Sequence, residues 1–437
     1  MNIKTIFNIL FLISLSVSGQ QLLTKQEAIS VALENNYGIK IAKNNLKIAE
    51  NNKNILNSGY LPTLDVNAGA TYSLDDTEAT YSDGRVTNLT GAESDRYNTS
   101  ISLNYLLFDG MGRYYDYKTL KEQYNLTELQ ARQTIENTIL QLFSVYYNVA
   151  KLTEDYSLLQ QNLAISKDRL QRVQYQFEYG QNTKLAVLNA EVDVNNDSIN
   201  LLNTKQLLIN AKRDLYVVLG KEEAPNFTVD TLVNFNLAPS KESLFEKVKN
   251  NNVVLQQVEK NISINEFQIK ANKSGYLPTI GLSGSYGWNK NNNNEASFLA
   301  TSINNGLSAG ISLSWNIFDG GSTKTLVNNA KINLENQELI KEETILDITR
   351  TFNNAYDDYV NKLFILQTQE KNVQTNTNNF NRTEEQFKLG QVTSIEFRQA
   401  QLNLINAINA KNSAKYDAKM AELLVLQLSG DLLNIDY

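Results

Sequence analysis

Alternation of apolar and polar residues predicts four β-strands in this chain. Apolar residues occupy nearly every second position in Leu64–Leu74, Ile101–Leu107, Ile280–Trp288 and Ile311–Ile317, with small polar residues or glycines between them. A period of two over such stretches is typical of strands, because successive side chains point to opposite faces of a sheet. Each strand is therefore expected to have one apolar and one small, polar face.

A different period follows each pair of strands. The segments 110–180 and 320–390 contain no proline, and apolar residues in the first recur every three or four positions. This 3.5-residue repeat predicts a long helix of the coiled-coil type. Its seam comprises Leu142, Val145, Val149, Leu152, Tyr156, Leu159, Leu163, Leu170, Val173 and Phe177, with one position missing at Ser166. After Gly180 and Gly390 the chain is expected to turn and return as a second, shorter helix.

A further helix precedes the first strands. The segment Thr24-Lys-Gln-Glu27 has the form of a capping box, in which the first and last side chains satisfy each other's backbone N–H groups. It predicts a helix that starts at Ala28 and runs to about Asn57, with a break near Gly38.

Four landmarks recur in order, so the chain consists of two tandem repeats. The hexapeptide that starts at Gly59 returns at Gly275, Phe-Asp-Gly occurs at 108–110 and 318–320, Gln-Phe-x-x-Gly occurs at 176–180 and 386–390, and Gly220 matches Gly430. Each repeat is read as helix, strand, strand, long helix, helix. The expected segments are a signal peptide (1–19), a first repeat (20–220, strands about 60–108), a linker (221–240) with a short strand near 229–234, and a second repeat (241–437, strands about 276–318).

The first nineteen residues have the form of an export signal. Lys4 supplies a positive charge, Ile6–Val17 is mainly apolar, and small residues precede Gln20. No Cys follows to carry a lipid anchor, and the rest of the chain has no apolar run long enough for a transmembrane helix. The chain is therefore expected to be exported.

Composition excludes several classes of function. The 437 residues include 40 Lys and Arg against 47 Asp and Glu, a net charge of −7 that argues against nucleic-acid binding. There is no Cys and no His, which excludes thiolate sites and the commonest general base and metal ligand. The sequence Gly110-Met-Gly112 lacks the third glycine of a dinucleotide-binding loop, and neighbouring carboxylates such as Glu342 and Glu343 point apart on a helix. No catalytic residue, cofactor or metal is expected.

The amphipathic strands point to a membrane. Four strands cannot close a barrel with a lumen, and open edges cannot face lipid. We expect the strands to form part of a β-barrel shared between chains, with the apolar face toward lipid. The alternative is a non-conducting exported coiled-coil spacer or adhesin, which would leave the hairpins without burial. A loop expected at Asp75–Arg96 carries a net negative charge and predicts a mildly cation-selective mouth.

With these motifs and repeats, the sequence resembles the TolC-like outer-membrane efflux proteins. The resemblance rests on the N-terminal segment Glu27–Asn36, the two Gly-Tyr-Leu-Pro motifs, the two Phe-Asp-Gly motifs and the two Gln-Phe-x-x-Gly turns. It implies a mainly α-helical homotrimer in the outer membrane, in which twelve strands close one barrel that is continued by a helical tunnel into the periplasm. It also implies a passive exit duct that works with a periplasmic adaptor and an inner-membrane transporter in efflux or type I secretion. The cargo stays open among drugs, metal ions and proteins.

The resemblance also suggests where partners bind. In the family, the turns at the far ends of the helix pairs meet the adaptor, and Phe177, Gly180, Phe387 and Gly390 match that pattern. A glycine-capped helical hairpin with an aromatic contact would require the same residues, so both interpretations are kept. At the opposite ends of the long helices, Asp109-Gly110 and Asp319-Gly320 are expected to cap the strand-to-helix turns.

Acidic rings often narrow the tunnel of the family just past the tip. The corresponding positions here are Glu396 and Gln399 in the second repeat, and Ala186 and Asn189 in the first. At most one ring of carboxylates is therefore retained, and closure is expected to depend mainly on helix packing. The nearby Arg398 is in a position to pair with a neighbouring chain. A solvated helical glutamate is the alternative interpretation of Glu396.

Overall fold

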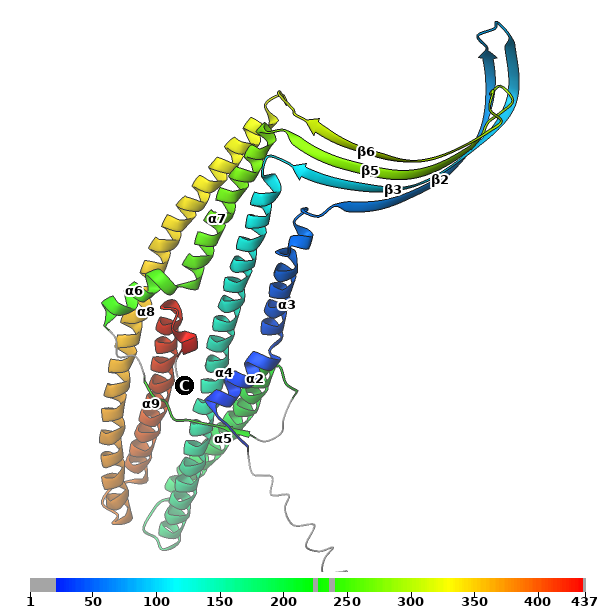
Figure 1. Cartoon of the computed structure of the whole chain (residues 1–437). Coiled ribbons are helices and arrows are strands. Elements are labelled where there is room, and N and C mark those ends of the chain that lie inside the picture. Colours follow the sequence, from blue (N-terminus) through cyan, green and yellow to red (C-terminus); the bar gives the residue numbers. More distant parts are fainter. Residues whose placement is uncertain (1–20, 223–226, 236–239, 435–437) are drawn as a thin grey trace, which may run out of the picture. The chain divides into compact units, whose positions relative to one another are not determined.

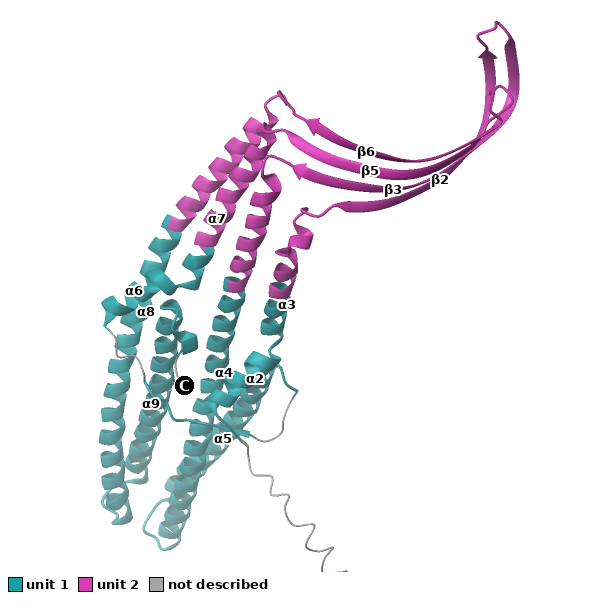
Figure 2. Cartoon of the chain, viewed as in Figure 1, with its two compact units in different colours: residues 1–45, 129–257, 342–437 teal, residues 46–128, 258–341 magenta. Residues whose placement is uncertain are grey.

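The computed structural model describes residues 21–222, 227–235 and 240–434 and forms two compact units. Unit 1 comprises residues 1–45, 129–257 and 342–437, and unit 2 comprises residues 46–128 and 258–341 (Figure 2). The predicted signal peptide 1–19 and parts of the linker 221–240 lie outside the described residues.

Unit 2 contains the predicted strands as one antiparallel sheet of order β2-β3-β5-β6 (Figure 1). The strands are β2 (Thr63–Thr80), β3 (Val86–Phe108), β5 (Thr279–Asn292) and β6 (Thr301–Ser314). Val66 pairs with Ile101, and Ile101 pairs with Tyr286. Directly paired residues share a face of the sheet, so the apolar positions of neighbouring strands come together. The prediction of strands with one apolar face is confirmed.

The prediction of a loop over Asp75–Arg96 is wrong. Strand β2 continues to Thr80, β3 already begins at Val86, and only a short turn separates them. Thr80 pairs with Val86 and Glu78 with Asn88, so backbone hydrogen bonding continues beyond the amphipathic part of the hairpin. These outer residues are mostly polar or exposed, and hydrophobic alternation therefore gave no sign of a strand.

All four strands are joined to helices at the same end of the sheet. Helix α3 (Tyr37–Asn52) leads into β2, β3 leads into α4 (Gly112–Glu178), α7 (Val253–Lys273) leads into β5, and β6 leads into α8 (Ser322–Lys388). Because neighbouring strands are antiparallel, these connections lie at one end and the turn 81–85 and loop 293–300 lie at the other. Lys260 bonds Glu122 at 3.1 Å and Lys341 bonds Glu259 at 2.9 Å between the helical segments of this unit.

Unit 1 contains two helical hairpins. The first consists of α4 from residue 129 onward and α5 (Lys184–Leu219), and the second consists of α8 from residue 342 onward and α9 (Ser394–Leu428). Gly220 ends α5 with a left-handed backbone (φ 66°), and a Cβ at this position would lie 2.4 Å from the carbonyl oxygen of Asn35. The long helices and their return helices thus agree with the sequence prediction. None of the described helices is long and apolar enough to cross a bilayer.

Shorter elements complete unit 1. Helix α2 (Lys25–Asn35) begins with the predicted capping box of Thr24 and Glu27. The helix is interrupted at Asn36, between α2 and α3. The side-chain amide of Asn36 donates to the carbonyl of Val218 at 2.8 Å, and its Oδ1 accepts from the Ile39 N–H at 3.2 Å. Helix α6 (Lys241–Asn251) precedes α7, and β1 (Gln21–Leu23) pairs in parallel with β4 (Phe227–Val229), slightly before the predicted strand.

The main core of unit 1 lies where α2, α4, α5 and α9 meet. Tyr146 of α4 is buried there, donates its hydroxyl to the carbonyl of Leu23 at 2.7 Å and accepts from the N–H of Asp230 at 3.0 Å. Burial raises the pKa of Tyr146 to about 12. The coiled-coil seam is buried in this core through Leu142 and Val149.

Candidate functional site: the hairpin turns and the polar cluster between the hairpins

The two Gln-Phe-x-x-Gly motifs form equivalent turns. Gly180 and Gly390 adopt left-handed backbone (φ 71° and 73°) and donate to the carbonyls of Phe177 and Phe387 at 3.0 and 3.1 Å. The following helices begin with Thr caps, since the hydroxyls of Thr183 and Thr393 accept from backbone N–H groups at 3.3 and 3.2 Å. The glycine-capped hairpin predicted from sequence is confirmed.

The two phenylalanines of these turns have different surroundings. Phe387 is only 5% exposed and stacks on Phe397 with ring centroids 4.9 Å apart, in a core cluster with Val173 and Val187. Phe177 is 41% exposed, and the Lys184 ammonium lies 5.7 Å from its ring centroid. In this structure Phe387 stabilises the hairpin, whereas Phe177 is accessible.

Two other residues of the turns are more exposed than either phenylalanine. Tyr179 is 80% exposed and Leu389 is 70% exposed, and each directly precedes the turn glycine. Sequence reasoning missed them because it gave weight to the repeated letters of the motif. An apolar or aromatic residue before the glycine in both copies was the available signal.

Glu396 caps its own helix. Its Oε2 accepts from the Thr393 backbone N–H at 2.7 Å and from the Thr393 hydroxyl at 2.8 Å. These hydrogen bonds, the backbone one first, hold the pKa of Glu396 below its ordinary value. Gln399 is exposed and bonds Asn403 at 2.8 Å. The local role of Glu396 is therefore capping, and its place in a ring of carboxylates stays a prediction.

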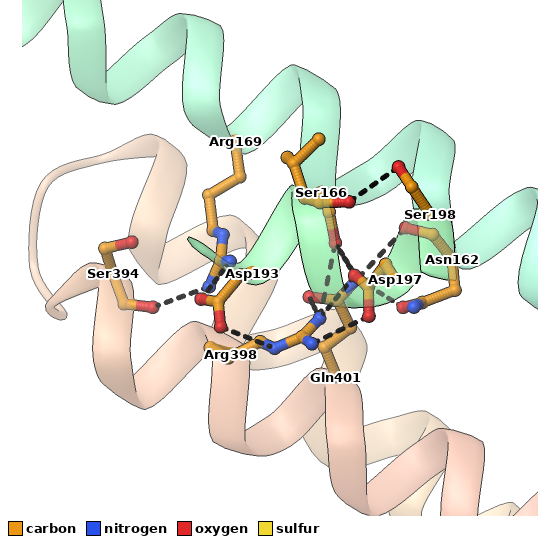
Figure 3. A network of polar contacts seen from close by, with 10 residues as sticks. Asn162, Ser166, Arg169, Asp193, Asp197, Ser198, Ser394, Arg398 and Gln401 are labelled. Atoms are coloured by element: carbon orange, nitrogen blue, oxygen red, sulfur yellow. Dashed lines mark hydrogen bonds and ion pairs between the residues drawn. The ribbon is translucent and has the colours of Figure 1, made fainter. Parts of the chain in front are cut away.

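A buried polar cluster joins the two hairpins just beyond these turns (Figure 3). We call it the inter-hairpin cluster, and its members are Asn162, Ser166 and Arg169 of α4, Asp193 and Asp197 of α5, and Arg398 and Gln401 of α9.

The Arg398 guanidinium is central to this cluster. Its Nη1 and Nη2 donate to Oδ2 and Oδ1 of Asp197, each at 2.8 Å. The side chain of Asp197 is 3% exposed and also accepts from the Ser166 hydroxyl at 2.6 Å. Bidentate pairing of a guanidinium with a carboxylate is the strong form of charge-assisted hydrogen bond. Arg398 thus pairs within its own chain, whereas the sequence suggested a neighbouring chain.

A second ion pair, between the buried Arg169 and the partly exposed Asp193, lies beside the first. Arg169 donates to Oδ2 of Asp193 at 2.5 Å and to the backbone carbonyl of Ser394 at 3.3 Å. Burial lowers the pKa of Arg169, and the hydrogen bond and charge of Asp193 oppose that shift. Arginine stays protonated in proteins, so Arg169 remains a cation. Asp193 also lies 3.6 Å from Nε of Arg398, so it links the two guanidinium groups.

Amide side chains complete the cluster. The Gln401 amide donates to Oδ1 of Asn162 at 2.6 Å and to the Ser166 hydroxyl at 3.1 Å, and all three residues are buried. A cavity of about 850 Å³ adjoins the cluster and is lined by residues of both turns, including Arg169, Asp193 and Glu396. Within one chain, ion pairs and amide hydrogen bonds therefore join the two hairpins in addition to helix packing, and closure of the tunnel mainly by helix packing stays a prediction.

The strand-to-helix turns are capped as predicted. In the first repeat, Oδ2 of Asp109 accepts from the N–H of Arg113 and from its guanidinium, both at 2.9 Å. In the second, Asp319 accepts from the N–H groups of Gly321 and Thr323 at 2.9 and 2.7 Å. These residues shape the chain where strand becomes helix, and no group of metal-binding side chains occurs among the described residues.

Comparison with known proteins decides the family. The family model described as "Outer membrane efflux protein" matches residues 28–221 and 244–431. The chain belongs to this family. It is therefore an outer-membrane protein of the efflux and secretion channel type, as the resemblance implied.

Individual relatives agree with the assignment. The chain is 22% identical to the outer membrane protein TolC of Vibrio cholerae, covering 79% of each sequence. It is 22% identical to the outer membrane efflux protein BepC of Brucella suis, covering 95% of this chain and 87% of BepC. Among solved structures, CusC matches with a TM-score of 0.75 at 15% identity, covering 93% of this chain and 92% of CusC. The last similarity shows that the chain has the fold of such channels.

Proposed function

We propose that this chain is the outer-membrane duct of a tripartite efflux or secretion assembly. Three copies form one closed β-barrel and one helical tunnel, through which cargo passes passively. Energy and cargo selection come from an inner-membrane transporter, and a periplasmic adaptor joins the two.

The sheet of unit 2 is the observation that carries this proposal. Its outer strands β2 and β6 each have one edge without a strand partner within the described chain. In a closed ring of copies, β6 of one chain lies antiparallel to β2 of the next, which continues the pattern of the sheet. Apolar residues such as Leu64, Val66 and Ile311 are exposed in the single chain and suit a lipid-facing surface.

The hairpin turns supply the surface for the adaptor in this proposal. Tyr179, Leu389 and Phe177 present exposed apolar side chains there, while Gly180 and Gly390 set the backbone of the turns. Phe387 acts indirectly, by holding the second hairpin on Phe397. This division refines the four contact residues expected from sequence.

The same region forms the periplasmic constriction. The inter-hairpin cluster holds the first hairpin to α9 of the second, and Glu396 borders the cavity beside it. Opening the tunnel requires the hairpins to separate and the buried ion pairs to part. Three copies of Glu396 near the axis would bind divalent cations, so Glu396→Ala is expected to weaken block by such cations from the periplasmic side.

Recording in planar bilayers tests the duct. Purified protein that has inserted should produce discrete ion-conducting steps without any nucleotide or partner. Inserted, folded protein that never conducts would contradict the proposal and favour the non-conducting spacer.

A further inference from the structure

The first hairpin of unit 2 extends beyond the rest of the sheet. Strand β3 pairs with β5 from Phe108 only as far as Asp95, which lies opposite Asn292. Residues 86–94 of β3 pair with β2 alone. We call residues 73–80 and 86–94 the outer ribbon. An isolated two-stranded ribbon has little stability of its own in water, so its position requires other contacts.

A bulge bends the outer ribbon near its base. Asp75 pairs with Ala92 but Thr77 pairs with Leu89, so one residue of β2 faces two of β3. Gly91 adopts a left-handed backbone (φ 65°) and donates its N–H to Oδ1 of Asp76 at 2.8 Å. Bulges bend a strand pair and increase its twist. The curved end of the ribbon is visible in Figure 1.

The tip of the ribbon contacts the loop between β5 and β6. The Tyr81 hydroxyl donates to the backbone carbonyl of Ala296 at 2.7 Å, and its ring packs edge-on against Phe298 with centroids 5.0 Å apart. The Arg85 guanidinium lies 5.2 Å from the centroid of the same ring. The loop itself is tied by the N–H of Asn293, which donates to the carbonyl of Ala300 at 2.9 Å. Tyr81 therefore joins two hairpins that are more than two hundred residues apart in sequence.

We propose that the Tyr81 contact fixes the outer ribbon across to the second hairpin and thereby controls the external mouth of the duct. The inference rests on the proposed function, because the ends of the sheet that lack helices face outward only if the helices are periplasmic. The ribbon carries Asp75, Asp76, Glu78 and Glu93, so its position also sets where negative charge stands at the mouth. When the contact of Tyr81 with the loop between β5 and β6 is lost, the outer ribbon can move, which changes the width of the mouth and the position of the negative charge there.

Limited trypsin digestion tests the contact without any need for conduction. The bond after Arg85 lies in the exposed turn of the ribbon. In Tyr81→Ala we expect cleavage there to accelerate about tenfold, since a hydrogen bond and an edge-on ring pair are lost. Tyr81→Phe keeps the ring and should show a smaller, about threefold, increase.

Two variants in the opposite loop separate the contact from local effects in the turn. Phe298→Ala leaves the turn sequence intact and should also accelerate cleavage after Arg85. Leu299→Ala, which removes the neighbouring exposed apolar side chain, should leave the rate at the wild-type value. Equal rates in wild type, Tyr81→Ala and Phe298→Ala would overturn the contact.

Single-channel recording tests its consequence. Tyr81→Ala and Phe298→Ala should show larger fluctuations of the open-channel current than wild type and Leu299→Ala. If wild type conducts and all variants give identical traces, the control of the mouth is refuted even if the contact exists. If wild type never conducts, the proposed function fails, whereas the digestion rates still decide whether the contact holds the ribbon.

Discussion

Replacement of Arg398 by alanine should strongly destabilise the helical hairpins. The variant removes both hydrogen bonds to Asp197 at 2.8 Å and the bonds to Ser166 and Gln401 at 3.3 Å. The side chain of Asp197, which is only 3% exposed, would then lose its bidentate partner. Removal of one partner from a buried ion pair costs about 3–5 kcal/mol, because the remaining charge is uncompensated.

A double-mutant cycle gives the sharper form of this prediction. Arg398→Leu combined with Asp197→Leu removes both charges and replaces them with apolar side chains, which is often nearly neutral. The double variant should therefore be more stable than either Arg398→Leu or Asp197→Leu alone. Thermal unfolding in detergent, followed by far-ultraviolet circular dichroism, measures this. Arg382→Ala, an exposed arginine of α8, is the control and should change stability by less than about 0.5 kcal/mol. Strictly additive losses in the double variant would refute the reasoning.

Other residues give independent expectations. Phe387→Ala should cost about 3–5 kcal/mol in thermal unfolding, whereas the exposed Phe177→Ala should cost less than about 1 kcal/mol. Because the pKa of Tyr146 is raised, its neutral hydroxyl contributes stability below pH 10, and this contribution is lost between pH 10 and about 12. The free energy of unfolding should therefore fall less steeply with rising pH in Tyr146→Phe. Gly110→Ala should destabilise more than Gly320→Ala: both glycines have positive φ, but only at Gly110 would the new Cβ lie 2.6 Å from a backbone oxygen.

Much of the fold is predictable because strong local signals mark its boundaries. The Phe-Asp-Gly turns and the capping glycines place the ends of α4 and α8, and side-chain alternation identifies the inner parts of all four strands. The outer ribbon was missed because its residues are exposed or polar on both faces. Its strands exist through pairing with each other, and a single segment does not reveal such pairing.

The inter-hairpin cluster was missed for a different reason. Arg398 and Asp197 each look like an ordinary polar residue on a helix, and they lie 201 residues apart in sequence. Only tertiary packing brings them together. One signal was present, since the apolar seam of α4 is interrupted at Ser166, which is fully buried and bonds Asp197. A polar residue within an apolar seam indicates a buried polar layer.

The central claim, one pore built from three copies, is tested most directly by mixing labelled chains. The chain contains no Cys, so Ser283→Cys in β5, a residue of the small polar face, would introduce a unique thiol. Wild-type and cysteine chains are refolded together, and single pores are exposed to a charged thiol reagent. Three copies predict four classes of pore, which respond with none, one, two or three steps of reduced current. A different number of classes, or pores that never respond although the thiol is labelled, would contradict the account.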